Sequence, residues 1–187
     1  MDTLKDLNIF FLDYETTGFN PYHNDVIEVA IKLFGSDSYY QTLIKPIIDP
    51  KKPRAGGIHR LVPGKVVEIT GITDEMLIKQ GINTNQSTIK TLEYILKNAT
   101  EDKQPIYLVA HNGSVFDFLF LKRLIKEANI SVNSHRCGDN YTKLYEMTKR
   151  FRYIDSCLLA RLYMRDERVN QPRLCQKYNI VKNIIHK

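Results

Sequence analysis

The distribution of apolar residues along the chain predicts five strands. Residues 9–12, the short run I-F-F-L, have the pattern of a strand that is buried on both faces. Residues 24–34 and 39–44 predict two further strands that form an antiparallel meander with the first. Two short apolar runs, residues 106–110 and 151–154, predict the remaining strands.

Helical spacing of apolar residues separates these later strands. It predicts helices over residues 84–97, 115–128 and 156–164, with shorter helices at 141–149 and 172–178. The order is three strands, followed by helix, strand, helix, strand and helix. This order predicts an α/β fold with a mixed five-stranded sheet, and the absence of repeats or linkers predicts one domain over residues 1–187.

Composition narrows the class of protein. The 187 residues are 43% hydrophobic, which excludes general disorder, and their net charge of +6 suits a polyanionic partner without requiring one. The three cysteines lack metal-type spacing, and no apolar run approaches the ~18 residues of a membrane span. We therefore expect a soluble intracellular protein of the cytoplasm or nucleus, with no membrane partner.

Two acids follow the first strand directly. Asp13 and Glu15 are two positions apart, so in an extended chain they share one face, roughly 7 Å apart. Like charges in one small region are costly unless a cation lies between them. Hard cations such as Mg²⁺ and Mn²⁺ prefer carboxylate oxygens, so the pair predicts half of a metal site.

A second acidic position follows the strand at 106–110. The segment A-H-N-G-S-V-F-D ends in Asp117 and opens a predicted helix. Because ligands of open α/β sheets gather at the carboxyl ends of strands, we expect Asp117 near Asp13. Asp155 also lies at a strand end, where we expect a structural role. Glu28, inside an apolar strand, is expected to be paired or to face an edge, with proximity to the site as the alternative.

Taken together, these segments resemble the DEDD superfamily of 3′–5′ exonucleases, His subtype, which includes proofreading exonucleases and ribonuclease T. The similarity covers residues 8–186. It is carried by D-Y-E-T-T-G (13–18), N-D-V-I-E-V-A (24–30), I-T-G-I-T-D-E-M-L (69–77), A-H-N-G-S-V-F-D (110–117) and Y-I-D-S-C-L-L-A-R (153–161).

The resemblance implies a ribonuclease-H-like fold with helices on both sheet faces, and two-metal hydrolysis of DNA or RNA 3′ ends with Mg²⁺ or Mn²⁺. Its partners would be single-stranded or frayed 3′ ends. Whether the protein also binds a polymerase or a second copy of the chain is left open. The metal ligands would be Asp13, Glu15 and Asp117, and His186 would be the general base. The substrate contacts would be Thr16, Thr17, Gly18 and Asn112, although Asn112 also suits a turn-holding role.

One feature departs from the family pattern. There the His of the third motif is followed five residues later by a fourth aspartate, whereas here His186 is followed only by Lys187. The domain is therefore expected to be short at its C-terminal side, either as part of an exonuclease or as a naturally short member with impaired chemistry. A catalytically impaired nucleic-acid-binding domain is the alternative function. A ribonuclease-H-like endonuclease matches these motifs poorly.

Overall fold

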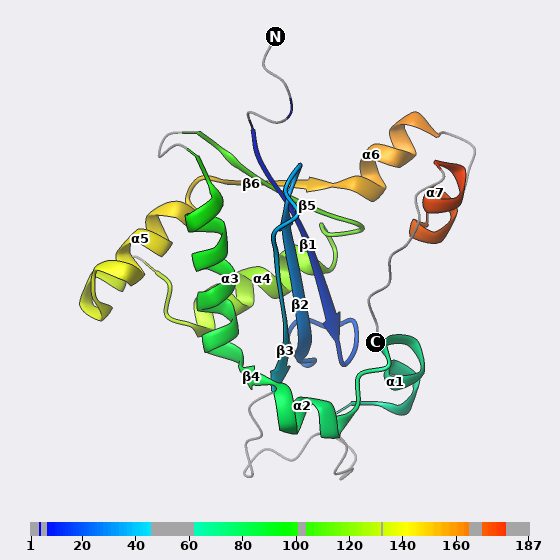
Figure 1. Cartoon of the computed structure of the whole chain (residues 1–187), viewed down its shortest axis with the longest axis horizontal. Helices are drawn as coiled ribbons and strands as arrows, with labels where there is room; N and C mark the ends of the chain where they lie inside the picture. The colour runs from blue at the N-terminus through cyan, green and yellow to red at the C-terminus, as the bar shows by residue number, and fades with distance from the viewer. Residues whose placement is uncertain are drawn as a thin grey trace.

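The computed structural model describes residues 4, 7–45, 62–100, 104–131, 133–164 and 170–178. Its central strand, β1 (Asn8–Thr16), buries Phe10, Leu12 and Tyr14 and turns the intervening side chains to the opposite face. This alternation places the hydrophobic core on one face of β1 and its two acids on the other. The strand crosses the middle of the molecule in Figure 1.

The sheet is mixed, as the sequence predicts. β1 is antiparallel to β2 (Val26–Leu33), which is antiparallel to β3 (Tyr39–Lys45). On its other side β1 is parallel to β5 (Ile106–Ala110), which is parallel to β6 (Phe151–Asp155). The described sheet has one strand more than the five predicted from the sequence. The additional strand, β4 (Ile82–Asn83), pairs with β3, and the strand order is β4-β3-β2-β1-β5-β6. Two residues are too few to show a strand period.

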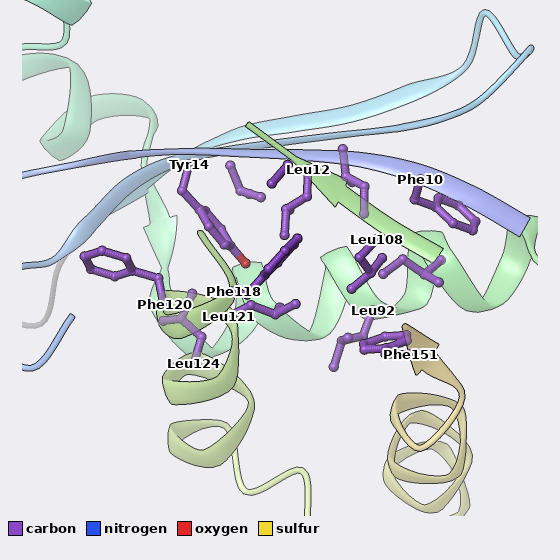
Figure 2. Packing of buried hydrophobic residues seen from close by; sticks show 14 of the residues in the cluster. Phe10, Leu12, Tyr14, Leu92, Leu108, Phe118, Phe120, Leu121, Leu124 and Phe151 are labelled. Carbon is purple, nitrogen blue, oxygen red and sulfur yellow. The ribbon is translucent and has the colours of Figure 1, made fainter. Parts of the chain in front are cut away.

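Helices lie on both sides of the sheet, as expected. α3 (Thr84–Asn98), α4 (Asp117–Glu127) and α5 (Asp139–Thr148) lie on one side, whereas α6 (Ser156–Tyr163) and α7 (Gln171–Lys177) lie on the other (Figure 1). The core forms where α3 and α4 meet the buried face of the sheet. Figure 2 shows Phe10, Leu12, Tyr14, Leu92, Leu108, Phe118, Phe120, Leu121, Leu124 and Phe151 in this core.

Two short helices occupy the region that the sequence places before the first helix. α1 (Gly64–Thr70) ends at Gly71, whose positive φ of 72° suits glycine, and α2 (Asp74–Gln80) begins at the capping side chain of Thr73. Both pack with Ile27 of β2 in a second apolar cluster. Each helix has only seven residues, and neither was predicted from the apolar pattern. A 3₁₀ helix, Ser134–Cys137, also escaped prediction.

One residue assigned from the sequence, His186, lies outside the described residues. Among the helices of the described residues, none is both long enough and apolar enough to cross a membrane.

Candidate active site

The candidate site forms where β1 extends beyond its parallel neighbour. β5 pairs with β1 only from Asn8 to Phe11, whereas β1 continues to Thr16. Asp117, the first residue of α4, lies beside this unpaired stretch, and its Oδ1 accepts a hydrogen bond of 3.0 Å from the Tyr14 amide. The carboxylate thus satisfies a backbone donor that the parallel ladder leaves unpaired. Asp117 is only 2% exposed.

Asp13 and Glu15 flank the residue that binds Asp117. The buried side chain of Tyr14 packs into the core near Phe118 (Figure 2), so the side chains of Asp13 and Glu15 point to the opposite face of β1. Asp13 is exposed and Glu15 is half-buried. All three acids therefore lie at the same end of the sheet.

The electrostatics of Asp117 show that the other two acids are near. Burial, then the charge of Asp13 and more weakly that of Glu15, raise its pKa to about 7, although the Tyr14 N–H acts in the opposite direction. A buried carboxylate beside two further negative charges is unfavourable as an ion. A bound cation would reverse this, because it would favour the ionised form of all three groups.

Asp13, Glu15 and Asp117 are chemically suited to bind a hard divalent cation. All three groups supply carboxylate oxygens, and burial together with the charges of Asp13 and Glu15 disfavours the ionised form of Asp117. In the part of the chain that the structure describes, no three His, Cys, Asp or Glu side chains are gathered closely enough to hold a metal in the positions shown. The convergence of the acids as ligands therefore stays a prediction, and it would require movement of the exposed side chains.

The loop before α4 is held by Asp155. Its Oδ1 accepts the Asn112 amide and its Oδ2 accepts the Ser114 amide, each at 3.0 Å, while the same carboxylate caps α6 through the amides of Cys157 and Leu158. Burial would raise the pKa of Asp155, but hydrogen bonds from the amides of Ser114, Leu158 and Cys157 and from the Ser114 side chain outweigh burial and lower it. Asp155 thus has the structural role that the sequence predicts.

Asn112 and Gly113 shape the turn that carries Asp117. Asn112 has a positive φ of 63°, which asparagine tolerates better than most residues. A Cβ on Gly113 would lie 2.7 Å from the Cβ of Ala110 and 2.8 Å from the Phe118 ring. Asn112 therefore holds the turn through its backbone, and a contact between its side chain and substrate stays a prediction.

The predicted substrate residues Thr16, Thr17 and Gly18 lie at the end of β1 and just after it, where they take part in local hydrogen bonds. The Thr16 hydroxyl donates to the Gly18 carbonyl at 2.7 Å. The Thr17 amide donates to the Asp25 carbonyl at 2.8 Å, and the Thr17 hydroxyl accepts from the Asp25 amide at 2.9 Å. These bonds stabilise the loop conformation, while direct contact of Thr16, Thr17 or Gly18 with substrate stays a prediction.

Arg123 is a residue of this site that the sequence analysis missed. From α4 its Nη1 donates to the carbonyls of Pro21 and, at 2.7 Å, of Asn24. The Asn24 side chain lies where a Cβ on Gly18 would be, with a separation of 2.8 Å. Arg123 therefore ties the loop after β1 to the helix that begins with Asp117. Nothing local in the sequence indicates this contact, which spans 99 positions.

Exposed aromatic side chains border the same loop. Phe19 is 88% exposed, and its ring centroid lies 6.0 Å from that of Phe116, the residue before Asp117. Tyr22 is also exposed. An exposed aromatic ring beside a carboxylate site offers a surface on which a planar base can stack.

Glu28 lies on the neighbouring strand, directly opposite Glu15 in the antiparallel register. Its Oε1 accepts a 3.0 Å hydrogen bond from Gln41 Nε2 on β3. Glu28 is thus both paired, as expected, and close to the candidate site, which was the alternative.

The protein is thus an α/β protein with a mixed sheet, in which Asp13 and Glu15 of β1 and Asp117 of α4 lie at the same end of the sheet. The RNase_T family model, described as an exonuclease family, matches residues 10–187. The chain belongs to this exonuclease family.

Individual relatives agree with this membership. A PolC-type DNA polymerase III of Thermotoga maritima is 34% identical over 67% of the chain, which corresponds to 8% of the polymerase. The chloroplastic/mitochondrial exonuclease DPD1 of Arabidopsis thaliana is 28% identical over 88% of the chain and 44% of its own length. The chain thus spans less than half of these relatives.

Solved structures show the same fold. E. coli exonuclease I in complex with a dA16 oligonucleotide superposes with a TM-score of 0.62 and 17% identity, covering 96% of this chain and 37% of that enzyme. A zinc-bound exonuclease I–ssDNA complex gives a TM-score of 0.55, with 18% identity over 87% of this chain and 31% of that one. The ribonuclease-H-like α/β class expected from the sequence is confirmed.

Proposed function

We propose that the protein is a divalent-metal-dependent exonuclease that removes nucleotides from the 3′ ends of DNA or RNA. The observation that carries the proposal is the buried Asp117 carboxylate, which is bonded to the Tyr14 amide between two further acids that raise its pKa. Such a group is unfavourable alone and favourable beside a cation. Membership of an exonuclease family supports the same activity.

Asp13, Glu15 and Asp117 are the residues that would hold Mg²⁺ or Mn²⁺, with two ions expected for a complete family site. When bound, such cations make water a stronger nucleophile and stabilise the attacking and leaving oxygens of the phosphodiester. The role of the chain is to keep Asp117 fixed against β1 while Asp13 and Glu15 present their oxygens from the strand. His186 is proposed to take the proton from the attacking water.

The substrate proposed for this site is a single-stranded or frayed 3′ end. The loop of Thr16, Thr17 and Gly18 and the exposed ring of Phe19 lie beside the acids, where a terminal nucleotide would place its phosphate and base. An unpaired end can present its last base to an aromatic ring, whereas a base inside a duplex is already stacked. Because some relatives are PolC-type DNA polymerases, we also propose that the protein associates with a polymerase.

The direct test is degradation of a 5′-labelled single strand by the whole chain with Mg²⁺, with Mn²⁺ and with chelator. We expect products that shorten one nucleotide at a time, only in the presence of metal. Asp13→Ala should abolish them, whereas the matched control Asp37→Ala removes an exposed acid elsewhere and should leave them unchanged. Equal rates for Asp13→Ala and the unmodified chain would contradict the proposal. Binding without degradation would instead support the impaired nucleic-acid-binding alternative.

A further inference from the structure

A hollow of about 920 Å³ lies at the edge of the sheet that β6 forms. It is bounded by α5, the beginning of β5 and the edge strand β6, which lie together in Figure 1. β5 and β6 run in parallel from this hollow toward Ala110 and Asp155, where the candidate site begins. The lining reaches Tyr153 of β6, whose ring packs against Phe118, the residue after Asp117, so one end of the hollow approaches the candidate site.

The walls of the hollow are rich in cations. Lys143, Lys149, Arg150 and Arg152 line it, and Glu146 is the one acid among its described lining residues. Glu146 is committed to Lys149, with 2.5 Å between Oε1 and Nζ. Lys143 and Arg152 are exposed, so their charges are available to a bound anion.

The same hollow contains aromatic and apolar surface. Tyr107 and Tyr153 line it with several apolar side chains. The Tyr153 ring is 39% exposed and is held in place by Phe118, at a centroid separation of 4.8 Å, and by the Lys122 ammonium 5.0 Å from its centroid. The half-exposed ring of Tyr153 therefore offers a surface for base stacking, and the surrounding cations offer positive charge for phosphates.

We propose that this hollow is a second, non-catalytic site that binds single-stranded nucleic acid. The cations would contact the phosphates, and the tyrosines and apolar wall would receive unpaired bases. The bases of a duplex are stacked inside it and cannot reach the tyrosine rings, and an acidic peptide would contact the cations without the rings. A single strand therefore matches the lining of the hollow better than either. This site goes beyond the proposed function, since it requires neither hydrolysis nor a 3′ end.

The charge distribution favours a second contact of this kind. The catalytic end of the sheet carries Asp13, Glu15, Glu28 and Asp117, which repel phosphates, whereas the hollow carries the cations. A long strand could contact both regions at once. The hollow would therefore hold the strand during successive cleavage steps.

A circular single strand tests the site independently of the exonuclease, because it has no 3′ end. We would measure the affinity of the whole chain for a labelled circle of thymidines between 50 and 200 mM salt by fluorescence anisotropy. The double variant Lys143→Gln/Arg152→Gln should bind it roughly 5- to 20-fold more weakly, with a salt slope smaller by about 1.4 for two lost phosphate contacts. The control Lys90→Gln/Lys126→Gln removes two exposed charges outside the hollow and should have little effect.

Several outcomes would overturn the proposal. One is that the hollow variant and the control bind the circle with equal affinity. Another is that polyglutamate or a free thymidine nucleotide competes with the circle as strongly as a linear single strand does.

Unchanged melting temperatures of both variants show that folding is intact. Loss of circle binding in the variant supports the hollow even if the chain degrades nothing, so failure of the proposed function is distinguishable.

Discussion

The Tyr14 amide and the Asp117 carboxylate are 103 positions apart and are joined by a 3.0 Å hydrogen bond. The bond links the strand that carries two acids to the helix that begins with the third. It forms because β1 extends beyond β5 and leaves a backbone donor that the ladder does not satisfy. The position of Asp117 is thus determined by the end of strand pairing, and its burial follows from the same contact.

Replacing Asp117 with asparagine should stabilise the metal-free protein at alkaline pH. The unfolded carboxyl loses its proton near its ordinary pKa of 3.8, whereas the folded one keeps it up to about pH 7. Between these values the folded state binds more protons, so stability falls as pH rises. At pH 8 with chelator, Asp117→Asn should raise the free energy of unfolding by about 1–3 kcal/mol. Thermal melts from pH 4 to 8 measure this.

The difference between Asp117→Asn and the unmodified chain should shrink toward pH 4, where both side chains are neutral, and also when Mg²⁺ is added at pH 8. The exposed Asp37→Asn serves as the matched control and should show no such pattern. A variant that is less stable than the unmodified chain at pH 8 without metal would show that the ionised carboxylate is favourable there.

Asp155→Ala should destabilise the fold and disorder the loop before α4. The substitution removes the acceptor for the amides of Asn112 and Ser114 and also the cap of α6. Losing several buried acceptor contacts costs roughly 2–4 kcal/mol. Urea unfolding measures this cost. Asp155→Asn keeps one acceptor oxygen and should fall between the alanine variant and the unmodified chain; equal loss in both would mean that charge, and not hydrogen bonding, matters.

Arg123→Ala should weaken turnover by loosening the loop after β1. The guanidinium holds the carbonyls of Pro21 and Asn24, so its loss releases the segment that follows Gly18. Small misplacements can reduce rates by about 10²-fold, and we expect kcat to fall more than the metal affinity. Arg123→Lys should rescue only part of the activity, because lysine cannot present a planar fork. Lys126→Ala, on the same helix, is the control and should leave kcat unchanged.

Phe19→Ala should raise KM for single strands with little effect on stability. The ring is 88% exposed, so its removal disturbs little packing beyond the contact with Phe116. Loss of one base–aromatic stack costs about 1–3 kcal/mol, which is roughly a 5- to 100-fold rise in KM. Phe19→Tyr keeps a ring and should behave like the unmodified chain. Identical KM values for the alanine variant and the unmodified chain would exclude stacking at this position.

Local sequence determined much of the architecture. Strand and helix patterns placed the five longer strands and the helices α3 to α7 within a few residues, because periodicity of apolar residues is imposed by the two faces of each element. It also placed Asp13 and Glu15 on one face of β1, since alternation along a strand is local geometry. The two-residue β4 is too short to carry such a period, and α1 and α2 were not predicted.

Tertiary structure alone decided how the candidate site is held together. The pKa of Asp117 depends on its burial and on acids about 100 positions away, and Asp155 anchors a loop more than 40 positions before it. Arg123 reaches the loop after β1 only because α4 packs beside it. Each of these relationships depends on which backbone groups the sheet leaves unpaired and which helix lies next to them. Those are long-range contacts, and no local pattern of residue types encodes them.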